Sequence, residues 1–257
     1  MPMEITLPTG LRGNIRELGV IEENILSDPR LARSGKNLHK VLENCWLETL
    51  EPSIYNFNEG KFDARLLLQG DALVYLVKLR IETYGPEFLF DVNCPECGAK
   101  IAWELDLNEF LEVKTKELPA ESRRIIEEEG GIFEMTLPKS GHKVKFKLMT
   151  LYDELRFPQI RRESHDVMSS KLLDLSIVAI DGVEHRRAFL GLEGYPRGYE
   201  GEPKVMSSMD ATAIREEMEE VNGGLITTFE VECVTHGEVT VDLPFRDNFL
   251  LPKKRRR

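Results

Sequence analysis

The chain has 257 residues, of which 41% are hydrophobic and 31% are charged, a composition typical of a globular protein with a substantial core. No apolar stretch approaches the roughly 20 residues that a membrane-spanning helix needs, so we expect no membrane contact. The first residues show neither the basic nor the apolar region of a secretory signal. Together with only four cysteines, these features predict a cytoplasmic protein in a reducing compartment and exclude a disulfide scaffold.

The net charge of −11 is unevenly distributed along the chain. Five consecutive basic residues, Lys253 to Arg257, contribute +5, so the remaining 252 residues carry −16. A body this acidic repels phosphate backbones, which weighs against nucleic-acid binding. We interpret the basic tail, residues 252–257, as a solvated end; contact with an acidic partner or with nucleic acid is the alternative.

Residues 1–87 predict an N-terminal region of strand and helices. Residues 1–20 indicate strand and turn. From Leu38 to Trp46, apolar residues at i, i+3, i+4, i+7 and i+8 predict one face of an amphipathic helix, which ends soon afterwards at Glu51-Pro52. Cys45 lies on that face, so we interpret it as a small core residue and not as a metal ligand.

A second helix is predicted to begin at Asp71, which can cap it, and to end at Tyr84 before Gly85-Pro86. Its expected buried face comprises Leu73, Leu76, Val77 and the aliphatic stem of Arg80. The apolar period then changes to alternation, and residues 88–107 predict a β-hairpin whose turn contains Cys94 and Cys97.

The rest of the region 88–257 predicts further hairpins among helices. A short charged helix is expected at 118–130, and alternation on both sides of a turn predicts a central hairpin at 133–148. Residues 153–180 predict a helix, although their apolar end from 172 also fits a strand. The last predicted elements are an exposed loop at 191–203, a helix at 210–221 with Asp210 near its cap, a hairpin around Cys233 and an apolar strand from Leu243 to Leu250. These elements predict an α+β fold in which 1–87 and 88–257 form one compact unit.

One internal repeat stands out. The segment FDVNCPECG at 90–98 matches FEVECVTHG at 229–237 in the order Phe, acid, Val, polar, Cys, two spacers, ligand and Gly. The two segments are 139 residues apart, and alternating residues that end in Asp-Leu follow each of them. Two residues between ligands let one turn aim both side chains at a single point, and the following Gly allows a positive φ.

The repeat predicts a metal site made of Cys94, Cys97, Cys233 and His236. Three thiolates and one imidazole form a closed tetrahedral set that suits a structural Zn²⁺. On this hypothesis, two of the hairpins are zinc knuckles that one structural zinc brings together. A redox-active Cys94/Cys97 pair is the main alternative, but such a pair usually opens a helix in a βαβ unit. A site whose metal has been lost or replaced is the third possibility.

No catalytic motif is present, so we expect a protein that is not an enzyme. The sequence contains no phosphate-binding loop, HExxH, GxSxG or GxGxxG pattern. The remaining histidines have no repeated acid or ligand spacing around them, and we interpret them as surface or turn residues: His39, His142, His165 and His185. A zinc enzyme would also need a vacant coordination position, which four protein ligands do not leave.

The order of motifs resembles the T-even phage baseplate hub and hub-assembly-chaperone family, which also occurs in phage-like contractile injection systems. The matching pieces span roughly residues 5–250: the opening Leu7-Pro8-Thr9-Gly10-Leu11, the early Leu-rich helix, Gly70-Asp71, Leu79-Arg80, Thr83-Tyr84-Gly85, the CPECG knuckle, Ile180-Asp181-Gly182-Val183, and the late Cys hairpin closing on Phe245 and Phe249. Many relatives carry cysteine at all four knuckle positions, whereas His236 stands at the last position here.

The resemblance implies a structural or assembly protein of a contractile-tail baseplate, either a hub component or a chaperone that leaves. Its partners would be other baseplate or tail proteins, and it would act in the cytoplasm during assembly or within the particle. A zinc-ribbon adaptor for nucleic acid is the alternative from another class. That alternative needs a basic, aromatic-studded face around the knuckles, and Lys100 and Trp103 are outnumbered there by acidic residues.

Overall fold

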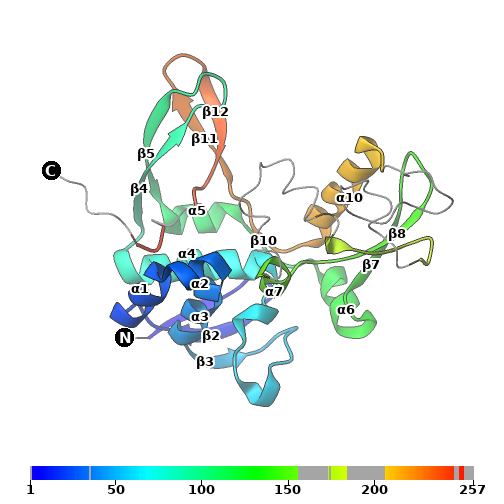
Figure 1. Ribbon diagram of the computed structural model, residues 1–257, viewed down its shortest axis with the longest axis horizontal. Coiled ribbons are helices and arrows are strands. Elements are labelled where there is room, and N and C mark those ends of the chain that lie inside the picture. The colour runs from blue at the N-terminus through cyan, green and yellow to red at the C-terminus, as the bar shows by residue number, and fades with distance from the viewer. Residues whose placement is uncertain are drawn as a thin grey trace. The chain divides into compact units, whose positions relative to one another are not determined.

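The protein was analysed as a computed structural model, which describes residues 2–34, 36–155, 173, 175–183, 206–245 and 249–251. The chain divides into two compact units (Figure 1). The first comprises Met1–Ala64, Gly70–Glu117 and Gly224–Arg257, and the second comprises Arg65–Gln69 and Leu118–Gly223. The two Cys-bearing hairpins thus share a unit with the N-terminal region, and the central hairpin belongs to the other unit. This grouping differs from the single unit that the sequence suggested.

The fold class is α+β, as predicted, because helices are mixed with several small antiparallel sheets. The first unit opens with a three-stranded antiparallel sheet in the order β1 (Met3–Thr6), β2 (Arg12–Ile15) and β3 (Trp46–Glu51). The strand and turn predicted at the N-terminus are therefore confirmed.

Helix α3 (Lys36–Cys45) ends directly before β3, so the prediction of a helix through Trp46 and on towards Pro52 is wrong. The Trp46 indole stacks on Phe62 with ring centroids 4.2 Å apart. It also covers Gly13 of β2, where a Cβ would lie only 2.1 Å from the ring. This packing and the pairing with β2 favour a strand over another helical turn.

Two short helices, α1 (Val20–Ser27) and α2 (Pro29–Ser34), precede α3 in the chain and escaped the sequence analysis. The apolar residues of α1 do not form a buried face, because Val20 and Ile21 are both exposed. A buried carboxylate in α1, described below, takes the place of an apolar face.

Helix α4 (Gln69–Tyr84) is the central helix of the first unit and ends before Gly85, as predicted. It begins before Asp71, which is fully buried and does not cap it. The Asp71 carboxylate instead accepts hydrogen bonds from the Thr9 backbone at 3.0 Å, the Thr9 hydroxyl and the Tyr55 hydroxyl at 2.7 Å. The buried surface is wider than predicted, since Val74, Tyr75 and Leu79 are buried while Leu73 is only partly so.

The predicted Cys-bearing hairpins are present as secondary structure. Strand β4 (Glu87–Asn93) pairs with β5 (Lys100–Asp106), and β11 (Thr228–Cys233) pairs with β12 (Gly237–Asp242), all antiparallel. Helix α5 (Leu107–Lys114) follows β5, and a short pair of strands, β6 (Thr115–Lys116) and β10 (Gly224–Leu225), leads into β11.

The second unit contains the predicted central hairpin. Strands β7 (Ile132–Thr136), β8 (Lys143–Lys147) and β9 (Ile177–Ile180) form one antiparallel sheet in that order. Helix α6 (Ala120–Glu129) precedes it and ends at Gly130 in the left-handed region, as its sequence predicted. Helix α7 (Leu151–Leu155) follows β8.

Three further predictions concern this part of the chain. Residues 177–180 form a strand, which was the alternative to the end of a long helix, and they pair with β8. The predicted helix at 210–221 is confirmed as α10 (Ser208–Val221): Ser207 is its N-cap, and Asp210 lies near it in the first turn, where its carboxylate accepts the Lys139 backbone N–H at 2.8 Å. The loop at 191–203 lies outside the described residues.

The apolar strand expected from Leu243 to Leu250 is not a strand in its described residues, 243–245 and 249–250. The side chain of Phe249 packs against Phe88 at the start of β4, with ring centroids 5.1 Å apart. Side-chain burial at the foot of the hairpins, without strand pairing, therefore explains this apolar pattern.

Candidate metal centre

The four predicted ligands lie together at the turns of two hairpins in the first unit. Cys94 follows β4 and Cys97 lies in the turn before β5, whereas Cys233 ends β11 and His236 directly precedes β12. Figure 1 shows the two hairpins side by side with their turns at the same end. Residues 139 positions apart in the chain thus meet at one point.

Strict alternation explains why the hairpins meet in this way. In β4 the residues Phe88, Phe90 and Val92 are buried, and in β11 Phe229 and Val231 are buried, while the residues between them are exposed. The two apolar faces pack against each other, with the rings of Phe90 and Phe229 edge to face at 5.9 Å. Because the cysteines continue the buried register of each strand, Cys94 and Cys233 point into the same interface.

The turns hold the ligands in similar ways. The Cys94 N–H donates to the Ala99 carbonyl and the Gly98 N–H donates to the Cys94 carbonyl, each at 2.8 Å. Gly98 and Gly237, which follow the second ligand of each half-site, both have φ of +71°. A side chain at either position would be strained, so glycine is required where the chain turns back into the next strand.

The distances between the ligand atoms fit a single metal ion. Cys94 Sγ and Cys233 Sγ lie 3.7 and 3.8 Å from His236 Nδ1, and Cys97 Sγ lies 3.9 Å from Cys233 Sγ. All four atoms lie within 4.8 Å of one another. A tetrahedral zinc with bonds of about 2.3 Å to sulfur and about 2.0–2.1 Å to nitrogen separates its ligand atoms by about 3.6–3.8 Å. The cluster can therefore hold a metal ion with little rearrangement.

The electrostatics of the cluster also favour a cation. Hydrogen bonds from the Thr235 backbone, His236 side chain and His236 backbone lower the pKa of Cys233 to about 6. The Cys233 and Cys94 sulfurs raise the pKa of His236. At Cys97 the Ala99 backbone N–H lowers the pKa, but desolvation and the two neighbouring thiols outweigh it, so that pKa is raised. The neighbouring thiols thus oppose deprotonation of Cys97, and a dication would remove that opposition.

Aromatic side chains support the cluster from beneath. Phe110 of α5 packs edge to face on Phe229 at 5.8 Å, and Phe88 stacks on Phe90 at 4.8 Å and meets Phe249 at 5.1 Å. These contacts continue the hairpin interface down to α5 and to the last described residues. The metal ligands therefore close the open end of an interface that apolar packing already defines.

The exposed faces of the hairpins are acidic. Residues 87–106 and 228–242 contain nine carboxylates and one lysine, Lys100, which pairs with Asp91 at 2.9 Å. On the β11–β12 face, Glu232 and Glu238 lie directly opposite each other in the strand register. Like charges directly opposite each other destabilise a hairpin, so the pairing of these two strands does not itself favour this pair of glutamates.

The other candidate residues fall outside this centre. Cys45 is fully buried, and that burial raises its pKa to about 12, which confirms its place in the core. His39 is buried on α3, so its assignment to the surface is wrong, whereas His142 lies at a turn and pairs with Asp181. His165, His185 and the tail 252–257 lie outside the described residues. Within the part of the chain that is described, no other group of three or more potential ligands converges.

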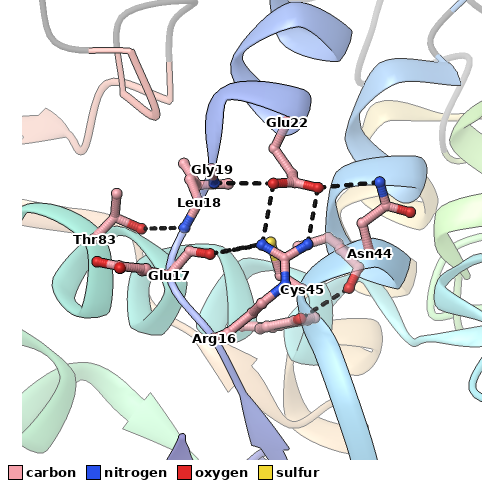
Figure 2. Close-up of polar contacts among 10 residues, drawn as sticks. Arg16, Glu17, Leu18, Gly19, Glu22, Asn44, Cys45 and Thr83 are labelled. Atoms are coloured by element: carbon pink, nitrogen blue, oxygen red, sulfur yellow. Dashed lines mark hydrogen bonds and ion pairs between the residues drawn. The ribbon is translucent and has the colours of Figure 1, made fainter. Parts of the chain in front are cut away.

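Sequence analysis missed a second polar cluster in the first unit, shown in Figure 2. The Glu22 carboxylate of α1 is 1% exposed and accepts bonds from Arg16 at 3.0 and 3.1 Å, Gly19 N–H at 2.9 Å and Asn44 at 3.1 Å. The bond from Arg16 is the main cause that lowers the Glu22 pKa to about 2. The spacing of Gly19 and Glu22 as N-cap and N3 is the one sequence signal that would have indicated it.

The cluster joins the segment that follows β2 to α1 and α3, and donors from Arg16, Gly19 and Asn44 satisfy both oxygens of the Glu22 carboxylate. We therefore interpret it as a structural element that fixes α1 in place, and not as a binding site.

Comparisons with known proteins give no family for this chain. No protein-family description, no curated protein and no solved structure matches it. None of the described helices has the length and apolar character needed to cross a membrane.

Proposed function

We propose that Cys94, Cys97, Cys233 and His236 bind one structural Zn²⁺ that clamps the two hairpins together. The observation that carries this proposal is the convergence of four ligand atoms, from half-sites 139 residues apart, at the spacing of a tetrahedral metal site. Thiolate and imidazole ligands in a tetrahedron favour zinc over the harder cations that prefer oxygen.

A clamp function follows from the position of the ion. Each half-site alone offers two ligands, so only a pair of hairpins in contact can complete the coordination. The ion then links residues near position 95 to residues near position 235 and stabilises the packed interface beneath it. Because protein atoms fill all four positions, the ion lacks a place for a catalytic water or substrate, and we propose a protein without catalytic activity.

At the level of the whole protein, we propose a structural or assembly role in the baseplate of a contractile tail or a related injection particle. The motif order described above supports this role, and the acidic hairpin faces provide charged surfaces for contacts with basic regions of partner proteins. Both a resident hub component and a departing assembly chaperone fit these features.

A nucleic-acid adaptor is the competing proposal, since paired Cys hairpins resemble zinc ribbons. The nine carboxylates and single lysine of the two hairpins oppose it, because phosphate binding requires positive charge at the contact surface. Fluorescence anisotropy with labelled single- and double-stranded DNA at about 50 mM salt separates the two, since electrostatic binding is strongest at low salt. We expect no saturable binding; tight binding would favour the adaptor.

Deletion of the gene from a contractile particle tests the assembly role. We expect tails or sheaths that lack a completed baseplate, visible by electron microscopy. Particles of normal structure from the deletion strain would refute the role. Mass spectrometry of purified wild-type particles then separates a resident component, which is present in them, from a chaperone, which is absent.

A further inference from the structure

Oxidation chemistry at the metal centre is constrained by unequal exposure of its thiols. Cys94 and Cys233 are 2% and 3% exposed, whereas Cys97 is exposed at the turn between β4 and β5. A small oxidant in solvent therefore reaches the Cys97 sulfur before it reaches the other two. Exposure to solvent therefore favours Cys97 as the cysteine that a small oxidant meets first.

A thiol of the other hairpin lies close to Cys97. The Cys97 Sγ lies 3.9 Å from the Sγ of Cys233, and both atoms belong to the four-ligand cluster that joins β4–β5 and β11–β12. A Cys94–Cys97 disulfide would instead have to form within a tight turn that is already held by the Gly98-to-Cys94 and Cys94-to-Ala99 backbone bonds. The second half-site cannot form its own disulfide, because His236 occupies its second ligand position.

We propose that the centre is a redox-sensitive link, in which hydrogen peroxide replaces the metal bridge with a Cys97–Cys233 disulfide across the same two hairpins. This inference rests on the proposed zinc site. It adds a regulatory property to that site: oxidation releases the ion yet keeps the hairpins joined.

The chemistry needs one peroxide for each disulfide. The Cys97 thiolate attacks one peroxide oxygen, the O–O bond breaks, and a sulfenic acid and hydroxide result. The Cys233 thiolate then attacks the Cys97 sulfur, the S–S bond forms and the sulfenic oxygen leaves as hydroxide. Protons convert both hydroxides to water, so two thiols lose two electrons and peroxide gains them. Cys94 and His236 remain as two ligands, which are too few to retain a structural zinc.

The test uses the full chain, purified anaerobically, with its zinc content measured before oxidation. After addition of about one equivalent of hydrogen peroxide, a colorimetric chelator records released zinc, and non-reducing peptide mapping identifies the disulfide. We expect most of the zinc to be released together with a Cys97–Cys233 disulfide, and we expect a dithiol to restore zinc binding. A Cys94–Cys97 disulfide, or overoxidation of Cys97 without any disulfide, would overturn the proposal.

Cysteine variants sharpen the result. Cys45→Ser removes the buried core thiol and should leave the mapped disulfide unchanged, whereas Cys233→Ser should abolish it. The wild-type peptide map remains decisive if a variant fails to fold. Protein that contains no zinc before oxidation would refute the zinc proposal itself, whereas zinc-loaded protein with the wrong disulfide would refute only the redox link.

Discussion

Replacement of a single metal ligand should cost far more stability than replacement of an equally buried cysteine elsewhere. Cys94 and Cys45 are both free and nearly inaccessible to solvent, so Cys94→Ser and Cys45→Ser make the same chemical change in matched surroundings. Only Cys94 belongs to the four-ligand cluster. The difference between the two variants therefore isolates the contribution of the metal.

The magnitude follows from the loop that the ion closes. A cross-link between positions 139 apart removes about 5 kcal/mol of chain entropy from the unfolded state in the loop-closure treatment used for disulfides. We expect Cys94→Ser to lose about 3–5 kcal/mol in the free energy of unfolding, because a weakened metal link forfeits most of that restraint. Cys45→Ser exchanges a small apolar contact for a buried hydroxyl and should lose about 1–2 kcal/mol.

Urea unfolding with and without a zinc chelator measures both effects. The wild type and Cys45→Ser should each fall in stability when the chelator is added, whereas Cys94→Ser should change little. Equal losses for the two variants, unaffected by chelator, would refute the reasoning.

Three further predictions concern the first unit. Gly224→Ala should lower the melting temperature clearly, because Gly224 has φ of +154° and an added Cβ would lie 2.6 Å from the Gly70 Cα; an unchanged melting curve would contradict this close approach. Arg80→Met should keep or raise the free energy of unfolding measured in urea, because the Arg80 guanidinium is buried and its Nε and Nη1 lack hydrogen-bond partners. A loss of more than about 3 kcal/mol in that free energy would show that the charge is paired. Glu22→Gln should have a lower free energy of unfolding than the wild type at neutral pH, and this difference should narrow as pH falls from about 4.5 towards 2. The reason is that a carboxylate whose pKa is lowered by folding stabilises the folded state above its unfolded pKa and loses this contribution when it is protonated. A stability difference that does not depend on pH in acid titrations would contradict the Arg16 interaction.

The hairpins and their ligands were predictable because two signals coincide there. Alternation with period 2 specifies a strand face, and the repeated Cys-x-x-ligand-Gly pattern specifies a turn. Either signal alone would leave the partner hairpin undetermined. The matching Phe-x-Val-x-Cys register places both sets of ligands on facing apolar surfaces, which is why segments so distant in sequence were assigned to one site.

Elsewhere, tertiary contacts overruled the local pattern. Trp46 does continue the helical spacing of α3, but its stacking on Phe62 and its packing over Gly13 place it in β3. Asp71 has the sequence context of an N-cap, but hydrogen bonds from Thr9 and Tyr55 use its carboxylate in the core. Glu22 was missed for a related reason: its spacing from Gly19 signals only a helix cap, and no short-range pattern reveals that Arg16 and Asn44 converge on the same carboxylate.

The central claim is that one zinc ion joins the two hairpins. X-ray absorption spectroscopy on protein purified without added metal, combined with elemental analysis, tests it most directly. We predict one zinc per chain, bound by three sulfurs at about 2.3 Å and one nitrogen at about 2.0–2.1 Å. Protein with no bound metal, or a metal whose shell is dominated by oxygen, would contradict the claim.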